Sequence, residues 1–600
     1  MKLFFEKVSF FSHFLAFFTY ILSKGKNMTQ IINMTQIIKK LFLAVLATLC
    51  FWTSEITSID YGKIVFEDGV LVNDTATDID EKGDIIDMSQ EANQVVIKTL
   101  YDYEPFYNYK EEIDEDATYE EVEEYKTKYR ARAKEYYTAK NNEYLMNQKM
   151  TDYERVYVSK YSPQIEYSYT INAYNTHKHE ILTKLAKDND VSQVYVSSAH
   201  VERVECLQAH LYFMGEQDIY KNRVYTGEGV VIGILDLGLV DTSRANFGGI
   251  DVTTLNQLGF TDLPGEHASQ MACTFAGIFG IACDAKILSA QLHVTMTNEV
   301  EWMIDRNVDV INMSFGNTFA DGTYGSESAF ADYIVKTYDV MICASVGNNG
   351  QGNAMVSNPA MGYNVLSVGA AMTTGDAISS SNYKVADLCP PKPVVVAPGD
   401  TITVPGYDLP ITGTSVATAF MTGSVALLYE KIPSYKTDAD KVIAYITCCS
   451  DMNDISYEDN GFSEKEGAGM YNYLNSLDSS FKIRRYSNTS GKRGDTFYGG
   501  VANLEVGDTL KVTMASLINC TGAVGSVNYT DYDIKVLDSS GNLVAIKACG
   551  ISNVEMLEYT PTVAGKYYIY LYQASERVNA SDQICYAYRV FNASKFHLHG

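Results

Sequence analysis

The sequence predicts an α/β core with a parallel sheet, preceded by an α+β unit and followed by an all-β sandwich. Between Gly229 and Leu477, short Val- and Ile-rich runs such as GVVIGILD and VMICASVGN alternate with helical stretches. Continuous apolar strands separated by helices are typical of a parallel sheet that helices cover on both faces. After Leu477, polar and apolar residues alternate around turns such as SSGN, which indicates an antiparallel sandwich.

The length of the chain and these changes of pattern divide it into four segments. A chain of 600 residues is too long for one ordinary hydrophobic core. We expect a targeting region over 1–55, an α+β domain over 90–200, the α/β domain over 215–480 and the sandwich over 485–600. Lys and Arg number 47 against 74 Asp and Glu, so the net charge of −27 repels nucleic acid, which we exclude as a partner.

The N-terminal region has the pattern of a secretory signal. The apolar stretch LFLAVLATLCFW follows Lys39 and Lys40 and precedes polar TSEITS, and it is too short to cross a membrane. We therefore expect a secreted protein. The alternative is a retained anchor, which the earlier stretch FFSHFLAFFTYIL supports; membrane contact, or retention at the cell surface, would then occur through this region alone.

The α+β segment begins with the strand-like run QVVIKTL, followed by a helical run near Thr118 to Lys149. IEYSYTINAY is strand-like, a helix is expected around Lys178 to Asp188, and VSQVYVS closes the segment as a strand. Residues 199–224 form a polar connector in which a processing site could lie.

Three residues carry the candidate chemistry. Asp236 ends a buried strand, His267 opens a helical run of small residues, and Ser415 opens an apolar helix. Each has an ordinary structural alternative: a turn cap, a structural histidine and a helix N-cap. Together they can act, because a serine hydroxyl needs a histidine to take its proton and the imidazole needs a carboxylate to orient it. The order Asp, His, Ser excludes the α/β-hydrolase arrangement.

The motifs around these residues resemble those of the subtilisin family of serine peptidases. GTSVATA stands where the family has GTSMAxP, with Ser415 in the position of the nucleophile. ASVGNNG resembles the family's AAGN region, which implies that Asn348 is the side-chain oxyanion donor. VDVINMSFG resembles the strand that pairs with substrate, and VVVAPG and GAGMYN are also familiar from the family.

The resemblance implies a subtilisin-like fold and a secreted serine endopeptidase that cleaves protein or peptide substrates through an acyl-enzyme. Three positions depart from the family pattern: Leu237 replaces Ser or Thr, Ala268 replaces Gly, and Ala419 replaces Pro. The alternative is therefore a catalytically silent relative that serves as a scaffold or binding protein at the cell surface.

The resemblance also implies a substrate pocket. Its walls and base would come from Ser314, Phe315, Gly316, Ser345, Val346, Gly347 and Ser357. None of these is charged, so we expect apolar or aromatic side chains before the scissile bond, and Lys and Arg to be disfavoured. The alternative is that Phe315 fills the pocket and admits only small residues. In the same segment we predict a cis bond between Asn358 and Pro359.

The flanking segments resemble companions of this family. The α+β segment is similar to the inhibitory propeptide, which would be removed autocatalytically, so the chain would be made as a zymogen. The C-terminal part is similar to the pre-peptidase-type β-sandwich of secreted bacterial peptidases. A sugar-binding role for this sandwich is the less favoured alternative, because the chain has only two Trp residues, both before Asn307. The chemistry requires no cofactor; the family allows structural calcium, for which the sequence identifies no ligands.

Overall fold

A computed structural model describes residues 63–67, 70–74, 94–198 and 225–592, apart from short gaps at 115, 149, 187, 189, 257–261, 294, 317–320, 351, 353, 405–406, 408–409, 454–457 and 579–581. The expected signal segment and most of the polar connector lie outside these residues. Within them, no helix is both long enough and apolar enough to cross a membrane.

The central unit, residues 225–477, is built on a nine-stranded sheet with the order β14-β15-β13-β12-β11-β10-β7-β9-β8. All neighbouring strands pair in parallel except β14 with β15. The strands are β7 (Val231–Asp236), β8 (Val252–Thr254), β9 (Lys286–Gln291), β10 (Val310–Met313), β11 (Met341–Ser345), β12 (Leu366–Ala371), β13 (Val395–Pro398), β14 (Ser450–Asp451) and β15 (Met470–Tyr471).

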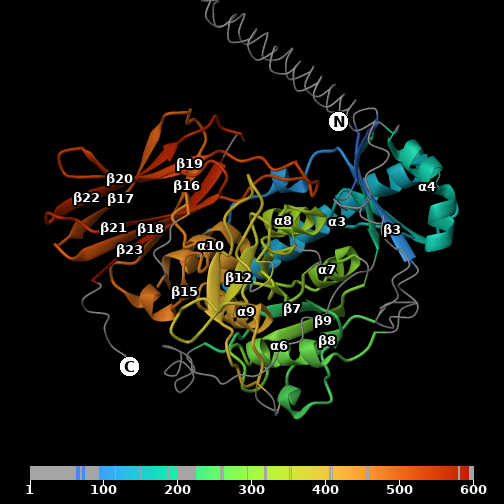
Figure 1. Cartoon of the computed structure of the whole chain (residues 1–600), viewed down its shortest axis with the longest axis horizontal. Coiled ribbons are helices and arrows are strands. Elements are labelled where there is room, and N and C mark those ends of the chain that lie inside the picture. The colour runs from blue at the N-terminus through green and yellow to red at the C-terminus, as the bar shows by residue number, and fades with distance from the viewer. Residues whose placement is uncertain are drawn as a thin grey trace, which may run out of the picture. The chain divides into compact units, whose positions relative to one another are not determined.

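Helices cover both faces of this sheet, which confirms the predicted α/β fold (Figure 1). Helices α6 (Glu266–Ala276) and α9 (Thr414–Lys431) lie on one side, and α7 (Thr297–Ile304) and α8 (Ser326–Tyr338) lie on the other. Helix α9 is buried from Thr414 to Tyr429, because it crosses strands β10 to β13. The central strands β10, β11 and β12 are buried at every residue, as expected for a sheet covered on both faces.

The N-terminal unit, which comprises the described residues between 63 and 198, contains a six-stranded sheet with the order β1-β2-β6-β3-β5-β4. Its elements are β1 (Lys63–Glu67), β2 (Val70–Asp74), β3 (Gln94–Tyr101), a short 3-10 helix η1 (Phe106–Tyr109), α3 (Tyr119–Gln148), β4 (Arg155–Val158), β5 (Gln164–Thr170), α4 (Ile171–Ala186) and β6 (Val191–Ser198).

One predicted boundary in this unit is wrong. The sequence predicted a strand to Tyr174 and a helix from about Lys178, but β5 ends at Thr170 and α4 begins at Ile171. The physical reason is local, since the Thr170 hydroxyl accepts a hydrogen bond from the Ala173 amide at 3.1 Å. A threonine that accepts such a bond starts a helix, and the apolar alternation around it does not reveal this cap.

Helix α3 packs against the central unit through buried charges. Lys126 forms an ion pair with Asp309, and the carboxylate of Asp309 also lies 3.1 Å from the ammonium group of Lys436. All three side chains are at most 2% exposed. Removing one partner of such a network leaves a buried charge uncompensated, so these contacts hold α3 in a specific position.

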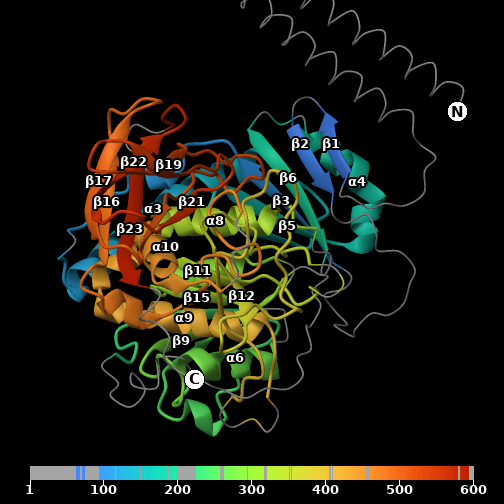
Figure 2. The ribbon, with the colours of Figure 1, turned by 60° about the vertical axis from the view of Figure 1, so that its left-hand side comes forward.

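The C-terminal sandwich consists of two antiparallel sheets with the orders β16-β23-β18-β21 and β17-β22-β19-β20. Helix α10 (Ala439–Cys448) of the central unit packs against its strands β16, β18 and β23 (Figure 2). The strands are β16 (Lys482–Asn488), β17 (Thr496–Leu504), β18 (Asp508–Ala515), β19 (Tyr532–Leu537), β20 (Leu543–Lys547), β21 (Val554–Tyr559), β22 (Gly565–Gln573) and β23 (Asp582–Asn592).

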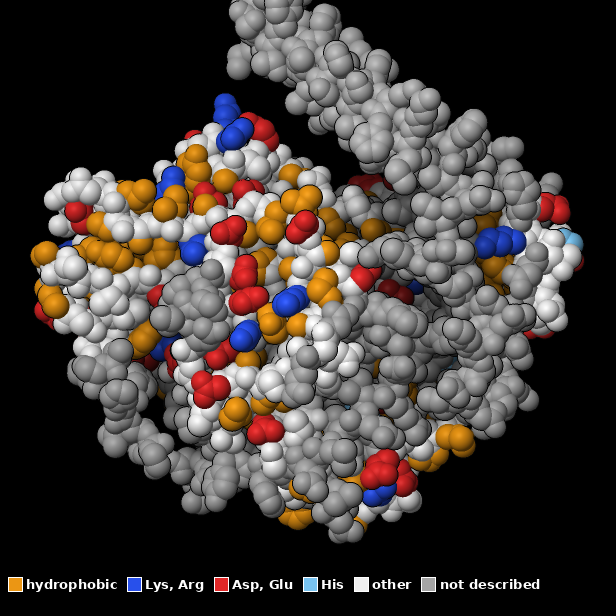
Figure 3. All heavy atoms as spheres, in the orientation of Figure 1, with side chains coloured by type: hydrophobic (Ala, Val, Ile, Leu, Met, Phe, Trp, Pro, Cys, Tyr) orange, Lys and Arg blue, Asp and Glu red, His pale blue; other side chains and the backbone are white. Residues whose placement is uncertain are grey.

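The surface agrees with the excess of acidic residues. Asp and Glu side chains are distributed over the described part of one face, interspersed with basic and apolar side chains (Figure 3). The described part of this face therefore presents no continuous basic surface of the kind that binds a phosphate backbone.

Candidate active site

The candidate catalytic residues lie at the carboxyl ends of the central strands. Asp236 is the last residue of β7 and is 1% exposed. Ser314 follows β10, in which Met313 pairs with Leu235, so Ser314 and Asp236 continue neighbouring strands. Strand β7 lies between β9 and β10, where the order of connection along the sheet reverses. Open α/β sheets bind their ligands at such a point.

His267 and Asp236 form a hydrogen-bonded pair. Nδ1 of His267, in the first turn of α6, lies 2.9 Å from Oδ2 and 3.0 Å from Oδ1 of Asp236. The histidine side chain is 32% exposed, whereas the carboxylate is buried. When Nδ1–H is donated to a carboxylate, the neutral imidazole presents Nε2 as the proton acceptor. The pair thus has the geometry of a general base with its orienting group.

Two glycines that the sequence analysis did not identify make this pairing geometrically possible. A Cβ atom on Gly238 would lie 2.7 Å from the Cα atom of Gly265, so only glycine allows these two backbones to approach. The segments are also joined by hydrogen bonds from Leu239 N to Leu263 O and from Gly265 N to Leu239 O, at 2.8 and 2.7 Å. The sequence feature that could have indicated this contact is a pair of glycines: one lies two residues after Asp236, and the other lies two residues before His267.

Ser415 lies at the N-terminus of α9 and is 3% exposed. Its hydroxyl donates to the carbonyl oxygen of Ser314 at 3.2 Å, and the Ser314 hydroxyl donates to the carbonyl oxygen of Ser415 at 2.9 Å. These two bonds hold the start of α9 against the end of β10. Amides in the first turn of a helix have no acceptor within the helix, and the helix dipole favours negative charge there.

Asn348 is positioned by Thr414, a further residue that the sequence analysis did not identify. The side-chain oxygen of Asn348 accepts hydrogen bonds from the Thr414 amide at 2.8 Å and from its hydroxyl at 3.0 Å. The Nδ2 atom of Asn348 is buried and has no hydrogen-bond partner within the described part of the chain. A buried amide donor without a partner is costly, which is expected where a ligand supplies the acceptor. The sequence feature that could have indicated this contact is the threonine directly before Ser415.

The structure brings together the residues predicted to form the substrate pocket. The Ser345 hydroxyl lies 3.4 Å from the carbonyl oxygen of Phe315, and the Ser357 amide donates to the carbonyl oxygen of Val346 at 3.2 Å. A Cβ atom on Gly316 would lie 2.2 Å from Oγ of Ser357, and one on Gly347 would lie 3.6 Å from it. The Ser357 side chain therefore occupies the space between the two glycines.

Two further observations concern the neighbourhood of this pocket. The bond between Asn358 and Pro359 is cis, as predicted. Phe315 is 9% exposed and belongs to the core of the central unit, so the structure keeps open the alternative that its ring restricts the pocket.

The three departures from the family pattern remove no group from the site. The Leu237 amide donates to Oδ1 of Asp236 at 2.7 Å, so the backbone at this position supports the carboxylate. Ala268 is buried in α6, and its methyl group packs in the core. Ala419 is buried in α9, which continues through this position to Lys431.

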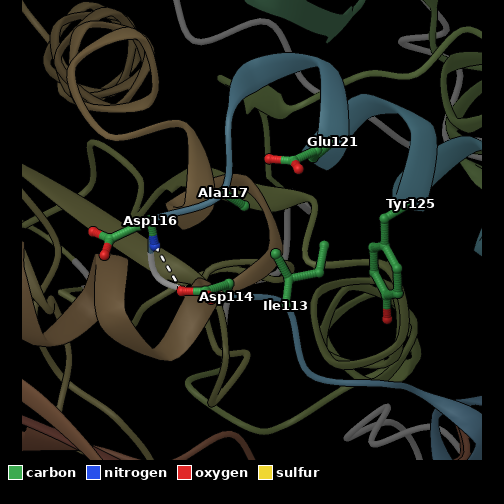
Figure 4. Close-up of a pocket in the computed structure, with 6 residues that line it drawn as sticks. All are labelled: Ile113, Asp114, Asp116, Ala117, Glu121 and Tyr125. Atoms are coloured by element: carbon green, nitrogen blue, oxygen red, sulfur yellow. Dashed lines mark hydrogen bonds between the residues drawn. The ribbon is translucent and has the colours of Figure 1, made fainter.

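A surface depression elsewhere contains none of the predicted site residues (Figure 4). It lies at the start of α3, where the Asp116 amide donates to the Asp114 carboxylate at 3.1 Å. It is lined by Ile113, Asp114, Asp116, Ala117, Glu121 and Tyr125. Its acidic groups belong to a turn and a helix start, and we assign it no chemistry.

Comparison with known proteins finds sequence similarity that includes the central unit. Residues 227–469 match the model of the subtilase family. The chain is 27% identical over 299 residues to subtilisin E of Bacillus subtilis (strain 168), which covers 45% of this chain and 74% of that protein. It is 26% identical over 272 residues to a thermostable alkaline protease of Halalkalibacterium halodurans, covering 42% of this chain and 71% of that protein. A similar solved structure is that of the prenylagaramide maturation protease PagA, with 22% identity, a TM-score of 0.35 and coverage of 43% of this chain and 96% of that one.

Proposed function

Because residues 227–469 are a domain of the subtilase family and the chain is a subtilisin-like serine peptidase, we propose that Asp236, His267 and Ser415 are its catalytic triad. The Ser415 hydroxyl turns from the Ser314 carbonyl toward Nε2 of His267, which accepts its proton. The Ser415 oxygen then bonds to the carbonyl carbon of the scissile peptide. Asp236 does not take up this proton, and its carboxylate stabilises the positive charge of the imidazolium.

The negative oxygen of the tetrahedral intermediate is stabilised by two donors. One is the backbone amide of Ser415 at the start of α9, and the other is Nδ2 of Asn348. His267 next gives its proton to the leaving amine, the C–N bond breaks, and an acyl-enzyme remains. Water, deprotonated by His267, releases the acid and restores the Ser415 hydroxyl.

The observation that carries this proposal is the orientation of Asn348. Its oxygen is held by Thr414, next to Ser415, and its buried nitrogen has no partner within the described residues. A purely structural asparagine would use both ends of its amide. A donor directed to a position where negative charge develops is what peptide hydrolysis requires.

Digestion of a peptide library tests the proposal. We expect the processed protein to cleave internal peptide bonds, with apolar or aromatic residues preferred before the scissile bond and Lys and Arg disfavoured. The His267→Ala variant should release no fragments. Equal cleavage by both proteins would show that the activity comes from another source, and a preference for Lys or Arg would contradict the uncharged pocket.

Substitutions at Ser357 should change specificity in opposite directions. Ser357→Gly removes the side chain between Gly316 and Gly347, and Ser357→Thr enlarges it. A methylene in such a pocket is worth about 1–3 kcal/mol, so we expect kcat/KM for an aromatic relative to an alanine substrate to rise about tenfold in Ser357→Gly and to fall in Ser357→Thr. Changes in the same direction for both variants would mean that Ser357 does not limit the pocket.

We also propose that the N-terminal unit acts as an intramolecular inhibitor. The end of its strand β4 and the turn that follows cover Glu301 of α7, whose carboxylate accepts hydrogen bonds from the Tyr157 hydroxyl at 2.5 Å and from the amides of Lys160 and Tyr161 at 3.0 and 3.3 Å. Together with the ion pairs of Lys126, these contacts support a tightly bound unit. Autocatalytic cleavage in the connector 199–224 would precede its release.

Release of this unit should depend on pH through Glu301. Burial raises the pKa of Glu301 from 4.5 to about 7, and release would return it toward its ordinary value. The bound form therefore holds an extra proton between these values, so binding strengthens as the pH falls through this window and is weakest above pH 7. Other titratable groups near this contact are Tyr157, Tyr161, Glu166, Glu299, Asp305 and Arg130.

Gel filtration of the processed protein checks this prediction. We expect the N-terminal unit to bind on the order of 100-fold more weakly at pH 8 than at pH 5. The fraction of the unit that remains bound at each pH measures this difference. In Glu301→Gln, which cannot titrate, this dependence should disappear. An equally steep dependence in Glu301→Gln would assign the effect to another group.

Export completes the proposal. The stretch LFLAVLATLCFW after Lys39 and Lys40 supports cleavage by a signal peptidase and a secreted product. N-terminal sequencing of the protein from the culture medium should find a start beyond Trp52, whereas a product confined to membranes with this stretch intact would favour the anchor.

A further inference from the structure

Three carboxylates converge in the C-terminal sandwich, outside the candidate active site. They belong to Asp531, which directly precedes β19, to Asp533 in β19 and to Glu555 in β21. One ligand atom from each residue lies within 4.8 Å of the others. Strands β19 and β21 belong to different sheets, so the cluster brings together side chains from both sheets of the sandwich.

The cluster is buried and its oxygens are not satisfied by the protein. Asp533 is 5% exposed and Glu555 is fully buried. The Asp533 carboxylate has no hydrogen-bond or ion-pair partner in the described part of the chain. Among the same residues, Oδ1 of Asp531 and Oε2 of Glu555 are buried without a partner, while the other oxygen of Glu555 accepts the Cys549 amide at 2.5 Å.

Within the residues that the structure describes, no basic side chain forms an ion pair with these carboxylates. Two lysines act electrostatically on the cluster from a distance: Lys535 on the carboxylate of Asp533, and Lys547 on that of Glu555. Lys535, however, lies over the ring of Tyr572, 3.1 Å from its centroid, and the Lys547 ammonium lies 3.5 Å from the carbonyl oxygen of Glu458. A cluster of buried carboxylates without cationic partners is strongly unfavourable unless another positive charge is supplied.

We propose that Asp531, Asp533 and Glu555 bind a calcium ion that links the two sheets of the sandwich. Carboxylate oxygens are the ligands that hard divalent cations prefer. Ca²⁺ binds oxygens at about 2.3–2.6 Å, so its ligand atoms can lie up to about 5 Å apart, whereas Mg²⁺ requires about 2.1 Å and a stricter geometry. A separation within 4.8 Å fits either ion, but three carboxylates supplied by the protein suit Ca²⁺ better, because Mg²⁺ dehydrates reluctantly and usually keeps several waters. Water molecules would complete its coordination.

The ion would also stabilise the contact between the sandwich and the central unit. Tyr529, two residues before Asp531, donates its hydroxyl to the carbonyl oxygen of Gly550 at 3.1 Å. Its ring packs against Tyr363 of the central unit, with 6.1 Å between the ring centroids. The calcium ion thus holds a segment of the sandwich that reaches the peptidase domain.

Calcium binding to the full chain tests the proposal, with Ser415→Ala as the background to prevent autolysis. Equilibrium dialysis counts the ions bound, and thermal unfolding is followed with Ca²⁺, with Mg²⁺ and with a chelator. The variants are Asp533→Asn and Glu555→Gln, which keep the size of each side chain but remove its charge. Glu505→Gln, an exposed site on the same sandwich, is the matched control.

We expect each cluster variant to bind one Ca²⁺ fewer than its parent and the control to bind the same number. Saturating Ca²⁺ should raise the unfolding midpoint of the parent on the order of 10 °C more than that of the variants. With the chelator the order should reverse, because Asp533→Asn relieves repulsion between carboxylates. An unchanged ion count in both variants would overturn the site, and binding of Mg²⁺ in preference to Ca²⁺ would overturn its assignment to calcium. Circular dichroism verifies that each variant is folded.

Discussion

Peptide hydrolysis by the Ser415→Ala variant should fall on the order of a million-fold in kcat, a magnitude known from subtilisin, a relative of this chain. The reason is that the Ser415 oxygen is the atom that forms the acyl-enzyme, and alanine does not supply it. Alanine loses the hydrogen bond from the Ser415 hydroxyl to the Ser314 carbonyl oxygen, but its own carbonyl oxygen still accepts from the Ser314 hydroxyl, so the variant should fold like the parent.

Ser424→Ala is the matched control for this loss. Ser424 is a buried serine of the same helix, and its hydroxyl donates to the carbonyl oxygen of Phe420 at 3.0 Å. We expect this variant to keep the parent's kcat within a few-fold. If Ser415→Ala turned over substrate at nearly the parent's rate, another residue would have to be the nucleophile.

Asn348→Ala should lower kcat by roughly 10²–10³ while KM changes little, again a magnitude known from subtilisin. Nδ2 of Asn348 meets the substrate oxygen only when negative charge develops on it, so the lost hydrogen bond belongs to the transition state. Steady-state kinetics on one peptide substrate separates the two constants.

The neighbouring Asn349 supplies a control for Asn348. Its side chain is exposed, and its contact with Asn382, at 2.8 Å, is made by the backbone amide, which alanine keeps, so Asn349→Ala should leave both constants nearly unchanged. A loss in Asn348→Ala that appeared mainly in KM would make Asn348 a ground-state binding residue.

The sequence was sufficient for the elements that depend on hydrophobic pattern. The parallel sheet follows from short runs of Val and Ile, and the strand ends place Asp236 and Ser314 together once the strands pair. The sandwich likewise follows from alternation of polar and apolar residues. These patterns express burial on one or two faces, which is the strongest signal in a single sequence.

Other parts of the site depend on close approach between distant segments, which one sequence does not reveal. The contact of Gly238 with Gly265 and the hydrogen bonds from Thr414 to Asn348 form only when segments distant in the sequence meet. The start of α4 was missed because the cap at Thr170 competes with an apolar alternation that continues past it. The pairing of Lys126 with Asp309 links residues far apart in the chain, and no local pattern indicates that these charges are buried.

The most direct measurement of the central proposal is labelling of the processed protein with a fluorophosphonate at pH 8, followed by mass spectrometry of the labelled peptide. Such a probe reacts with an activated serine far faster than with an ordinary serine hydroxyl, so it separates an active peptidase from a catalytically silent relative. We predict one label per chain, on Ser415, which is lost in His267→Ala. An unlabelled protein, or a label on another residue, would contradict the assignment of Asp236, His267 and Ser415 as a working triad.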